Sequence, residues 1–396
     1  MAERYVYIDY NATTPLRSEV KDAMISDFDV YANASSIHSS GRLARSRVED
    51  ARAAVASLLG SPPESIIFTS GGSESNNAVF QAMGLLAKKN ALSSVNDLPP
   101  RNEFITTAIE HPCVFNSGEH ASEMGHKVHF LPVDEYGKVK IDALKAVLGE
   151  KTLFVSVMMA NNETGTIQDI KEIARLAKAA GAYMHTDAVQ AVGKIPVNVI
   201  DLGVDYLTMS AHKIYGPKGI GALYIKKGAP LFPLIHGGHQ EEGLRAGTYN
   251  NMGILGFGKA AALAESDLGE YGRKTLALRT KLKEGLEAEI PNIKINGHPV
   301  DTLPNTLNIS FFGAEGEAIL LSMDLAGIEA STGSACASGS LEPSHVLLAM
   351  GLGPELAHGS IRFSLGWQSS DADVEYIIGT VPAIIHKLRA MSTIKV

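Results

Sequence analysis

The sequence predicts an α/β fold, with a mostly parallel mixed sheet in a large domain and a smaller α+β domain at the C-terminus. From about residue 48, helix-like and strand-like segments alternate, which is the pattern of βαβ units with helices on both faces of a sheet. The 396 residues exceed what one small core can organise, and 45% hydrophobic residues with 38 glycines are typical of a compact chain with many tight turns. Near residue 265 the alternation gives way to a long charged amphipathic segment.

Apolar periodicity and turn residues define the elements of the large domain. Residues 48–59 have the spacing of an amphipathic helix, and residues 65–69 form a short apolar run typical of a buried strand. A glycine turn then opens a second helix at 74–89, and the Asn, Ser, Asp and Pro-Pro content of 88–103 predicts a surface loop. We expect the remaining elements to be strands at 104–108, 127–132, 153–159, 183–186 and 206–210, and a helix at 171–180.

The C-terminal part begins with the long charged segment, which we expect to be a helix at 268–290 that links the two domains. Its further elements are strands at 306–311 and 360–364 and a final helix from about 372 to 391, with Ser370 or Asp371 as N-cap. We divide the chain into a large domain at 16–265 and a small domain at 266–396, with residues 1–15 packing near the small one.

Composition and charge exclude several classes of function. The chain has 35 basic and 43 acidic residues, a net charge of −8, so we expect no nucleic-acid partner. It has no run of eighteen apolar residues and no signal-peptide core, so we expect no membrane span. Its only two cysteines, Cys113 and Cys336, are far apart, which argues against a metal clip or a disulfide framework and favours a reduced, cytoplasmic compartment.

Lys213 is the most informative single residue. It lies in the run Ser-Ala-His-Lys-Ile-Tyr-Gly-Pro-Lys-Gly at 210–219, where a predicted strand ends and a tight turn begins. Ligands of α/β sheets bind at such strand ends. A desolvated lysine amine can lose its proton near neutral pH and attack a carbonyl to give a Schiff base. A lysine alone is more often structural, so this interpretation depends on the residues around it.

Those residues match the needs of an aldehyde phosphate cofactor, pyridoxal phosphate. The cofactor needs an anion site, a carboxylate for its ring nitrogen, a group over the ring face and an amine for its aldehyde. The turn at 70–75 lies between a strand and a helix, so its backbone N–H groups could bind the phosphate, although such turns are common. Ser210, His212 and Thr248 could add further donors.

Each other candidate also has a structural alternative. Asp187 could pair with the ring nitrogen and Gln190 with the ring oxygen, or Asp187 could simply cap a helix. His111 could stack on the ring, and Asn162 could hold the cofactor hydroxyl or a substrate carboxylate, unless it forms an Asx-turn. Their shared position favours the functional interpretation. Predicted strand exits of one sheet hold Gly72, His111, Asn162, Asp187 and Lys213.

A second reactive group is predicted at Cys336. The run at 331–340 consists of small residues without apolar periodicity, so its thiol is expected to be exposed and reactive. The alternative is a packing cysteine, which is how we interpret Cys113, but Cys336 lacks bulky apolar neighbours. Arg362 lies on a predicted strand and could clamp a carboxylate with two hydrogen bonds, or form a surface salt bridge.

Taken together, these motifs resemble those of cysteine desulfurases of the NifS/IscS type, which belong to the class-V aminotransferase family. The resemblance extends from residues 7–15 to the last helix, essentially the whole chain. Its most specific parts are residues 210–219, 161–165, 333–336 and 340–345. It implies the pyridoxal-phosphate-dependent transferase fold of type I and a homodimer.

The resemblance also implies roles around the cofactor. Lys213 carries it as a Schiff base and later acts as a base on the substrate, and His111 stacks on the ring and transfers protons. Asp187 pairs with the ring nitrogen, Gln190 with the ring oxygen, and Asn162 also contacts the cofactor. The phosphate is bound by Gly72, Ser73, Ser210, His212 and, from the partner subunit, Thr248.

For the substrate, L-cysteine, the resemblance implies that Asn33, Asn162 and Arg362 hold the carboxylate. Cys336 attacks the sulfur of the cysteine–cofactor adduct, which leaves L-alanine and an enzyme persulfide. The persulfide passes to a sulfur-acceptor or scaffold protein, typically in iron–sulfur cluster assembly, where Cys336 is also a candidate transient cluster ligand. No resident metal is expected.

The chain departs from the family pattern without losing a catalytic group. Residues 32–36 read Ala-Asn-Ala-Ser-Ser where the family usually has Gly-Asn-Pro-Ser-Ser, and the stretch 236–242 has His239 and an acidic residue in place of a usual glycine and basic residue. The alternatives are a selenocysteine lyase or another pyridoxal-phosphate-dependent enzyme of the aminotransferase kind. The segment with Cys336 argues against a transaminase, which needs no thiol. A catalytically silent scaffold would be expected to lack the lysine or the thiol.

Overall fold

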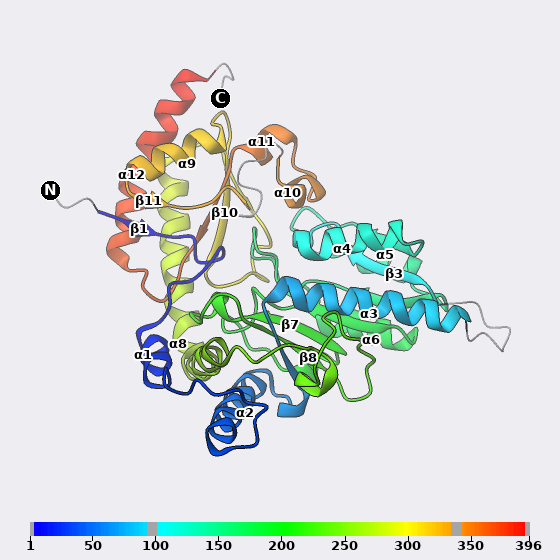
Figure 1. Cartoon of the computed structure of the whole chain (residues 1–396). Helices are drawn as coiled ribbons and strands as arrows, with labels where there is room; N and C mark the ends of the chain where they lie inside the picture. Colours follow the sequence, from blue (N-terminus) through cyan, green and yellow to red (C-terminus); the bar gives the residue numbers. More distant parts are fainter. Residues whose placement is uncertain (1–3, 93–100, 334–342, 393–396) are drawn as a thin grey trace.

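The computed structural model describes residues 4–92, 101–333 and 343–392 and contains a seven-stranded sheet (Figure 1). In chain order its strands are β2 (Ile66–Thr69), β3 (Glu103–Thr107), β4 (Lys127–Leu131), β5 (Thr152–Ser156), β6 (Tyr183–Asp187), β7 (Tyr206–Ser210) and β8 (Gly221–Ile225). In space the order is β2-β8-β7-β6-β5-β3-β4. Strand β8 runs antiparallel to β2 and β7, and the pairs from β7 to β4 are parallel. The sheet is mixed and mostly parallel, as predicted.

Helices cover both faces of this sheet. They are α1 (Ser18–Ser26), α2 (Ser39–Leu59), α3 (Gly72–Leu92), α4 (Pro112–Glu123), α5 (Ile141–Val147), α6 (Ile170–Ala179), α7 (Val199–Leu202) and the first half of α8 (Asn251–Glu289). Phe104 and Tyr206 pack in one core with α3 and α4, whereas their neighbours Ile105 and Leu207 pack in another with α2, α6 and α8. Successive strand residues point to opposite faces, so each strand contributes to both cores.

The C-terminal part forms a second unit around a three-stranded antiparallel sheet. Its elements are β9 (Ile293–Asn296), β10 (Thr306–Phe311), α9 (Gly316–Leu325), β11 (Ile328–Glu329), α10 (His345–Ala349), α11 (Pro354–His358), β12 (Ser360–Ser364) and α12 (Asp371–Met391). Strand β10 lies between β12 and β9, and apolar residues of α12 and the second half of α8 fill the core beside it. The N-terminal strand β1 (Val6–Tyr7) pairs with β11, so this strand lies against the second unit (Figure 1).

Helix α8 begins at Asn251, well before the predicted start at 268. Its first turns contain glycines, which locally disfavour a helix. Here they allow close packing, since a Cβ on Gly258 would lie 2.5 Å from the Cα of Ala51 in α2. Tertiary packing therefore outweighs local propensity. Because α8 runs through residues 265 and 266 without a break, the division of the chain at that point stays a prediction.

Other boundaries differ less. Helix α2 begins at Ser39 and not at 48, and α3 extends to Leu92, so the first residues of the expected loop at 88–103 are helical. Strands β10 and β12 have the predicted bounds, and Ser370 caps α12. Within the described ranges, no helix combines the length and the apolar character needed to cross a membrane.

Candidate active site

Lys213 lies just after β7, at the end of the 3₁₀ turn Ala211–Lys213. Its Nζ donates to the backbone carbonyl oxygens of Asn11 at 2.6 Å and Ala12 at 2.7 Å. The amine is thus turned toward the segment that follows β1. A strand exit of this kind is where α/β sheets bind their ligands.

Asp187 lies at the exit of β6, the strand next to β7. Its Oδ1 accepts a hydrogen bond from the Val189 backbone N–H at 3.0 Å, so the capping alternative describes one of its contacts. Its Oδ2 accepts from Asn76 Nδ2 at 2.7 Å. The carboxylate is buried and held by two neutral donors, which fix its orientation. Asn76 was not predicted, because an asparagine inside helix α3 has no distinguishing sequence signal.

His111 caps the N-terminus of α4, where its Nδ1 accepts from the Cys113 backbone N–H at 3.2 Å. The Cys113 Sγ lies 3.0 Å from the same Nδ1 and accepts from Asn76 Nδ2 at 3.1 Å. Burial lowers the pKa of His111, although Asp187 acts in the opposite direction. Burial also raises the pKa of Cys113 to about 12. The imidazole is therefore neutral, and because Nδ1 accepts a hydrogen bond, its proton lies on Nε2.

Helix α3 begins at Gly72, the first of the predicted phosphate ligands, with Ser73 next to it. A Cβ on Gly72 would lie 2.9 Å from Val189 Cγ2, so only a glycine lets the turn come this close to the exit of β6. N–H groups at such a helix start favour an anion. One nearby donor is already used, since the Ser70 backbone N–H donates to Glu74 Oε2 at 2.7 Å.

The other predicted phosphate ligands have different surroundings. Ser210 is buried at the end of β7, and its Cβ lies 4.0 Å from where a Cβ on Gly72 would be. His212 Nδ1 lies 3.1 Å from Thr13 Oγ1, and burial, with a nearby lysine, lowers the pKa of His212 to about 4. Thr248 is exposed in the loop before α8, beside a pocket of about 200 Å³ that this loop helps to line. The structure therefore brings Ser210 to the turn at Gly72 and leaves Thr248 at the surface.

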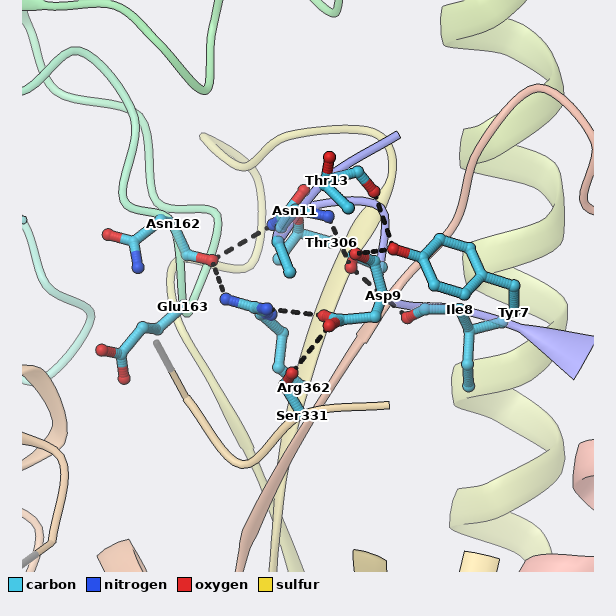
Figure 2. A network of polar contacts seen from close by, with 12 residues as sticks. Tyr7, Ile8, Asp9, Asn11, Thr13, Asn162, Glu163, Thr306, Ser331 and Arg362 are labelled. Atoms are coloured by element: carbon cyan, nitrogen blue, oxygen red, sulfur yellow. Dashed lines mark hydrogen bonds and ion pairs between the residues drawn. The ribbon is translucent and has the colours of Figure 1, made fainter. Parts of the chain in front are cut away.

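Arg362 lies in β12 and is buried, with 1% of its surface exposed, so the surface salt bridge considered from the sequence is wrong. Its Nη2 pairs with Asp9 Oδ1 at 2.6 Å, and the second Asp9 oxygen accepts from Ser331 Oγ at 2.9 Å (Figure 2). Its Nη1 donates to the backbone oxygen of Asn162 at 3.1 Å. Its Nε is buried and has no hydrogen-bond partner in the described part of the chain. Such a donor fits an added carboxylate.

The turn at 161–165 separates the roles of its two asparagines. Asn161 forms the Asx-turn, since its Oδ1 accepts from the backbone N–H groups of Glu163 and Thr164, both at 2.9 Å. Asn162 contributes its backbone oxygen to Arg362, while its side-chain amide points away from that network (Figure 2). The Asx alternative thus belongs to Asn161, and the Asn162 amide is not used by this turn.

Asn11 connects the predicted groups and was also missed from the sequence. Its backbone oxygen accepts from Lys213 Nζ and from Gln190 Nε2, the latter at 2.9 Å. Its backbone N–H donates to Ser364 Oγ and its Nδ2 to Thr306 Oγ1, both at 2.9 Å. It is 1% exposed. One buried residue therefore joins the N-terminal segment, the exits of the large sheet and the C-terminal sheet.

Asn33 is not brought into this cluster. It is exposed in the loop between α1 and α2, and its Oδ1 accepts from the Ser35 backbone N–H at 2.9 Å. No contact among the residues with assigned positions joins it to Lys213 or Arg362. The sequence cannot reveal this, because a loop asparagine looks the same whether it turns toward a site or caps its own turn.

Cys336 lies in 334–342, outside the described residues. On each side of this stretch a serine donates to a carboxylate, which is half-buried at Asp9 and buried at Glu163. Before it, Ser331 donates to Asp9. After it, Ser344 Oγ donates to Glu163 Oε2 at 2.5 Å.

Comparison with known proteins identifies the family of this chain. Residues 6–377 match the aminotransferase class-V family. A cysteine desulfurase IscS from Dictyoglomus turgidum is 47% identical over 394 residues, 99% of this chain and 98% of that protein. One from Clostridium botulinum is 46% identical over 393 residues, 98% of this chain and 96% of that protein. A solved NifS-like protein has a TM-score of 0.88 at 38% identity and covers 97% of this chain and 100% of its own. The chain therefore belongs to the class-V aminotransferase family, among the cysteine desulfurases of the NifS/IscS type.

Proposed function

We propose that this protein is a pyridoxal-phosphate-dependent cysteine desulfurase that converts L-cysteine to L-alanine and keeps the sulfur as a persulfide on Cys336. The observation that carries this is the meeting of groups from separate strand exits. Asn76 contacts both Asp187 and Cys113, and the Cys113 thiol touches His111. Lys213 lies at the next exit, hydrogen-bonded to the residue that also holds Gln190.

These groups fit pyridoxal phosphate. Asp187 would pair with the ring nitrogen, Gln190 with the ring oxygen, and the turn at Gly72 with the phosphate, while Lys213 would hold the aldehyde carbon. When bound, the cofactor supplies an electron sink for charge that develops on the substrate. The backbone at Gly72, packed too closely for a side chain, is the kind of cradle that a phosphate group needs.

The protein's own groups would bind the substrate and move its protons. Arg362, with its unpartnered Nε, would hold the substrate carboxylate together with the unused Asn162 amide. His111 enters as a neutral ring with its proton on Nε2, so it can donate that proton and later recover one. Lys213, once released from the cofactor, is the nearby amine that can act as the base.

Cys336 would remove the sulfur. Its thiolate would form an S–S bond to the substrate sulfur while the substrate C–S bond breaks. The electron pair stays with the carbon, where a proton completes alanine. Ser331, before the stretch with Cys336, donates to Asp9, the partner of Arg362. Ser344, after it, donates to Glu163, which follows the Asn162 that contacts Arg362. These two attachments support delivery of the thiol to this site.

The proposal includes a homodimer in a cytoplasmic setting and a sulfur-acceptor or iron–sulfur scaffold protein as partner. Thr248 is exposed in one chain, which suits a residue that completes the phosphate site of a partner subunit. A second support is a group of exposed apolar side chains on α1, α2 and the loop between them. Their exposed fractions are Ile25 58%, Phe28 70%, Tyr31 87%, Ile37 90% and Leu43 50%.

The test combines a spectrum with product analysis. The purified protein loaded with pyridoxal phosphate should show a visible absorbance band, and L-cysteine should yield alanine and, with a thiol reductant, sulfide. Lys213→Ala should lose the band. Cys336→Ala should keep the band and still bind L-cysteine but release no sulfide.

Two outcomes would contradict the proposal. A keto acid in place of alanine would favour a transaminase. Sulfide release at the normal rate by Cys336→Ala would exclude that thiol as the sulfur acceptor. Selenocysteine offered in parallel distinguishes the lyase alternative, which would act on selenocysteine and not on cysteine.

A further inference from the structure

Lys194 is a buried lysine that the proposed chemistry does not use. It is 3% exposed and follows Gln190 by four residues, in the turns after β6. Its Nζ donates to Gln190 Oε1 at 2.6 Å and to Asn11 Oδ1 at 2.8 Å. Burial is costly for an amine, so a lysine in this position needs a reason. Both partners are close to Lys213. The Asn11 backbone oxygen accepts from Lys213 Nζ, and Gln190 Nε2 donates to the same oxygen.

The hydrogen bonds around Gln190 fix which way its amide faces. A backbone carbonyl can only accept, so the amide atom that faces the Asn11 carbonyl must be Nε2. Lys194 donates to the opposite atom, which must then be Oε1. The two hydrogen bonds therefore indicate the same orientation of the Gln190 amide. The Nε2 group uses one N–H on Asn11, and its second N–H has no partner among the residues that the structure describes.

We propose that Lys194 is a positioning residue that holds Gln190 so that an amide N–H, and not the amide oxygen, faces the ring oxygen of the cofactor. This inference rests on the proposed function, because it assumes that pyridoxal phosphate is bound at Lys213. Without Lys194, only the Asn11 carbonyl opposes an amide that turns over and places an acceptor against a negatively charged oxygen. Burial and the nearby Lys213 and Arg362 lower the pKa of Lys194 well below its usual value. Either protonation state of the amine can still donate both hydrogen bonds.

The direct readout is the pH titration of the visible band of the loaded protein. A donor on the ring oxygen stabilises its negative charge, which increases when the nitrogen joining Lys213 to the cofactor loses its proton. Loss of that donor should therefore raise the pKa of the band. For Lys194→Met, which keeps the length and removes the donor, we expect a rise of about one unit, or about tenfold in the protonation equilibrium.

A double-variant comparison separates positioning from a general effect of the substitution. Loss of a charged amine near Lys213 would also raise the pKa of the band, but that effect would persist when Gln190 is absent. If Lys194 acts through Gln190, Lys194→Met should add little to the shift already present in Gln190→Ala. Additive shifts would overturn the proposal, as would a band in Lys194→Met that titrates like the wild type.

A matched control and a variant-free measurement complete the test. Lys138→Met also removes a lysine with two hydrogen bonds, to Ile167 O at 2.8 Å and Asp301 Oδ2 at 3.1 Å, but neither partner is Gln190. It should leave the titration unchanged, and a shift as large as that of Lys194→Met would overturn the proposal.

If Lys194→Met does not fold, a crystal structure of the loaded wild type decides. Lys194 should contact the Gln190 amide and the amide should contact the ring oxygen, whereas a Lys194 turned elsewhere would overturn the inference. A wild type without any visible band counts against the proposed function instead.

Discussion

Charged groups are held differently at the strand exits of the large sheet and in the Arg362 cluster, which consists of Arg362, Asp9 and Ser331. At the exits, Lys213 donates to two backbone carbonyls, and Asp187 accepts from a backbone N–H and from the Asn76 amide. In the cluster, the Arg362 guanidinium is paired with the Asp9 carboxylate. The neutral donors orient the Asp187 carboxylate without cancelling its charge, so that this charge stays available to a ligand. The ion pair with Asp9 holds Arg362 in the fold, and only the Arg362 Nε stays available to a further carboxylate.

The largest expected effect is therefore on stability and lies in the Arg362 cluster. Asp9→Ala leaves a buried guanidinium without its carboxylate, which typically costs about 3–5 kcal/mol. We expect a large fall in the denaturant midpoint, and a smaller one for Asp9→Asn, which can still hydrogen-bond. Lys281→Ala, which removes an exposed ion pair with Asp371 and Glu375, is the control and should change little. An Asp9→Ala midpoint equal to the control would break the comparison.

At the strand exits, two adjacent asparagines of α3 provide a matched pair. Asn76 is fully buried and donates to Asp187 and Cys113, whereas Asn77 donates to Ser73 O at the surface. Asn76→Ala should cost about 1–3 kcal/mol in the free energy of unfolding, because it leaves buried acceptors unsatisfied. Asn77→Ala should have little effect. Equal effects in denaturant unfolding would mean that the Asn76 bridge does not orient these groups.

A third prediction concerns Glu110, the carboxyl just before His111. It is fully buried, accepts from Met158 N at 2.9 Å, and burial raises its pKa from 4.5 to about 8. The folded protein thus binds a proton here that the unfolded chain has released, so this group makes stability fall as pH rises from about 4.5 to about 8. Glu110→Gln should flatten that part of the profile of unfolding free energy against pH. An unchanged slope would contradict the buried, protonated carboxyl.

The smallest expected effect concerns chemical reactivity. The Cys113 thiol should react slowly with an alkylating reagent. With Cys336 replaced by alanine, Cys113 is the only remaining thiol. Because burial raises its pKa to about 12, little thiolate exists near neutral pH. Alkylation should be slow at pH 8 and still accelerating at pH 10, and bound cofactor should slow it further. A rate that levels off near pH 8 would show an ordinary, accessible thiol.

The strand exits could be predicted from the sequence, and most of the contacts that hold them could not. Short apolar runs followed by glycine or polar turns are enough to assign Asp187 and Lys213 to one edge of a parallel sheet. The bounds of two strands of the C-terminal unit, β10 and β12, were also predicted correctly. These successes depend on local periodicity, which a sequence displays directly.

The partners come from distant parts of the chain and have no local signal. Asp9 meets Arg362 because β1 pairs with β11 and the N-terminal segment reaches β12. Asn76, in helix α3, and Lys194, in the turns after β6, carry no distinguishing local signal until the fold buries them. The early start of α8 was missed for the same reason, since its glycines favour a helix only when α2 packs against them.

The attachment of the cofactor to Lys213 can be measured directly. The loaded protein is reduced with borohydride, which fixes the cofactor to its lysine, and the peptides are then sequenced by mass spectrometry. The cofactor mass should be found on Lys213 alone, and on no peptide of Lys213→Ala. Its presence on Lys194 or Lys218, or on no lysine at all, would contradict the site described above.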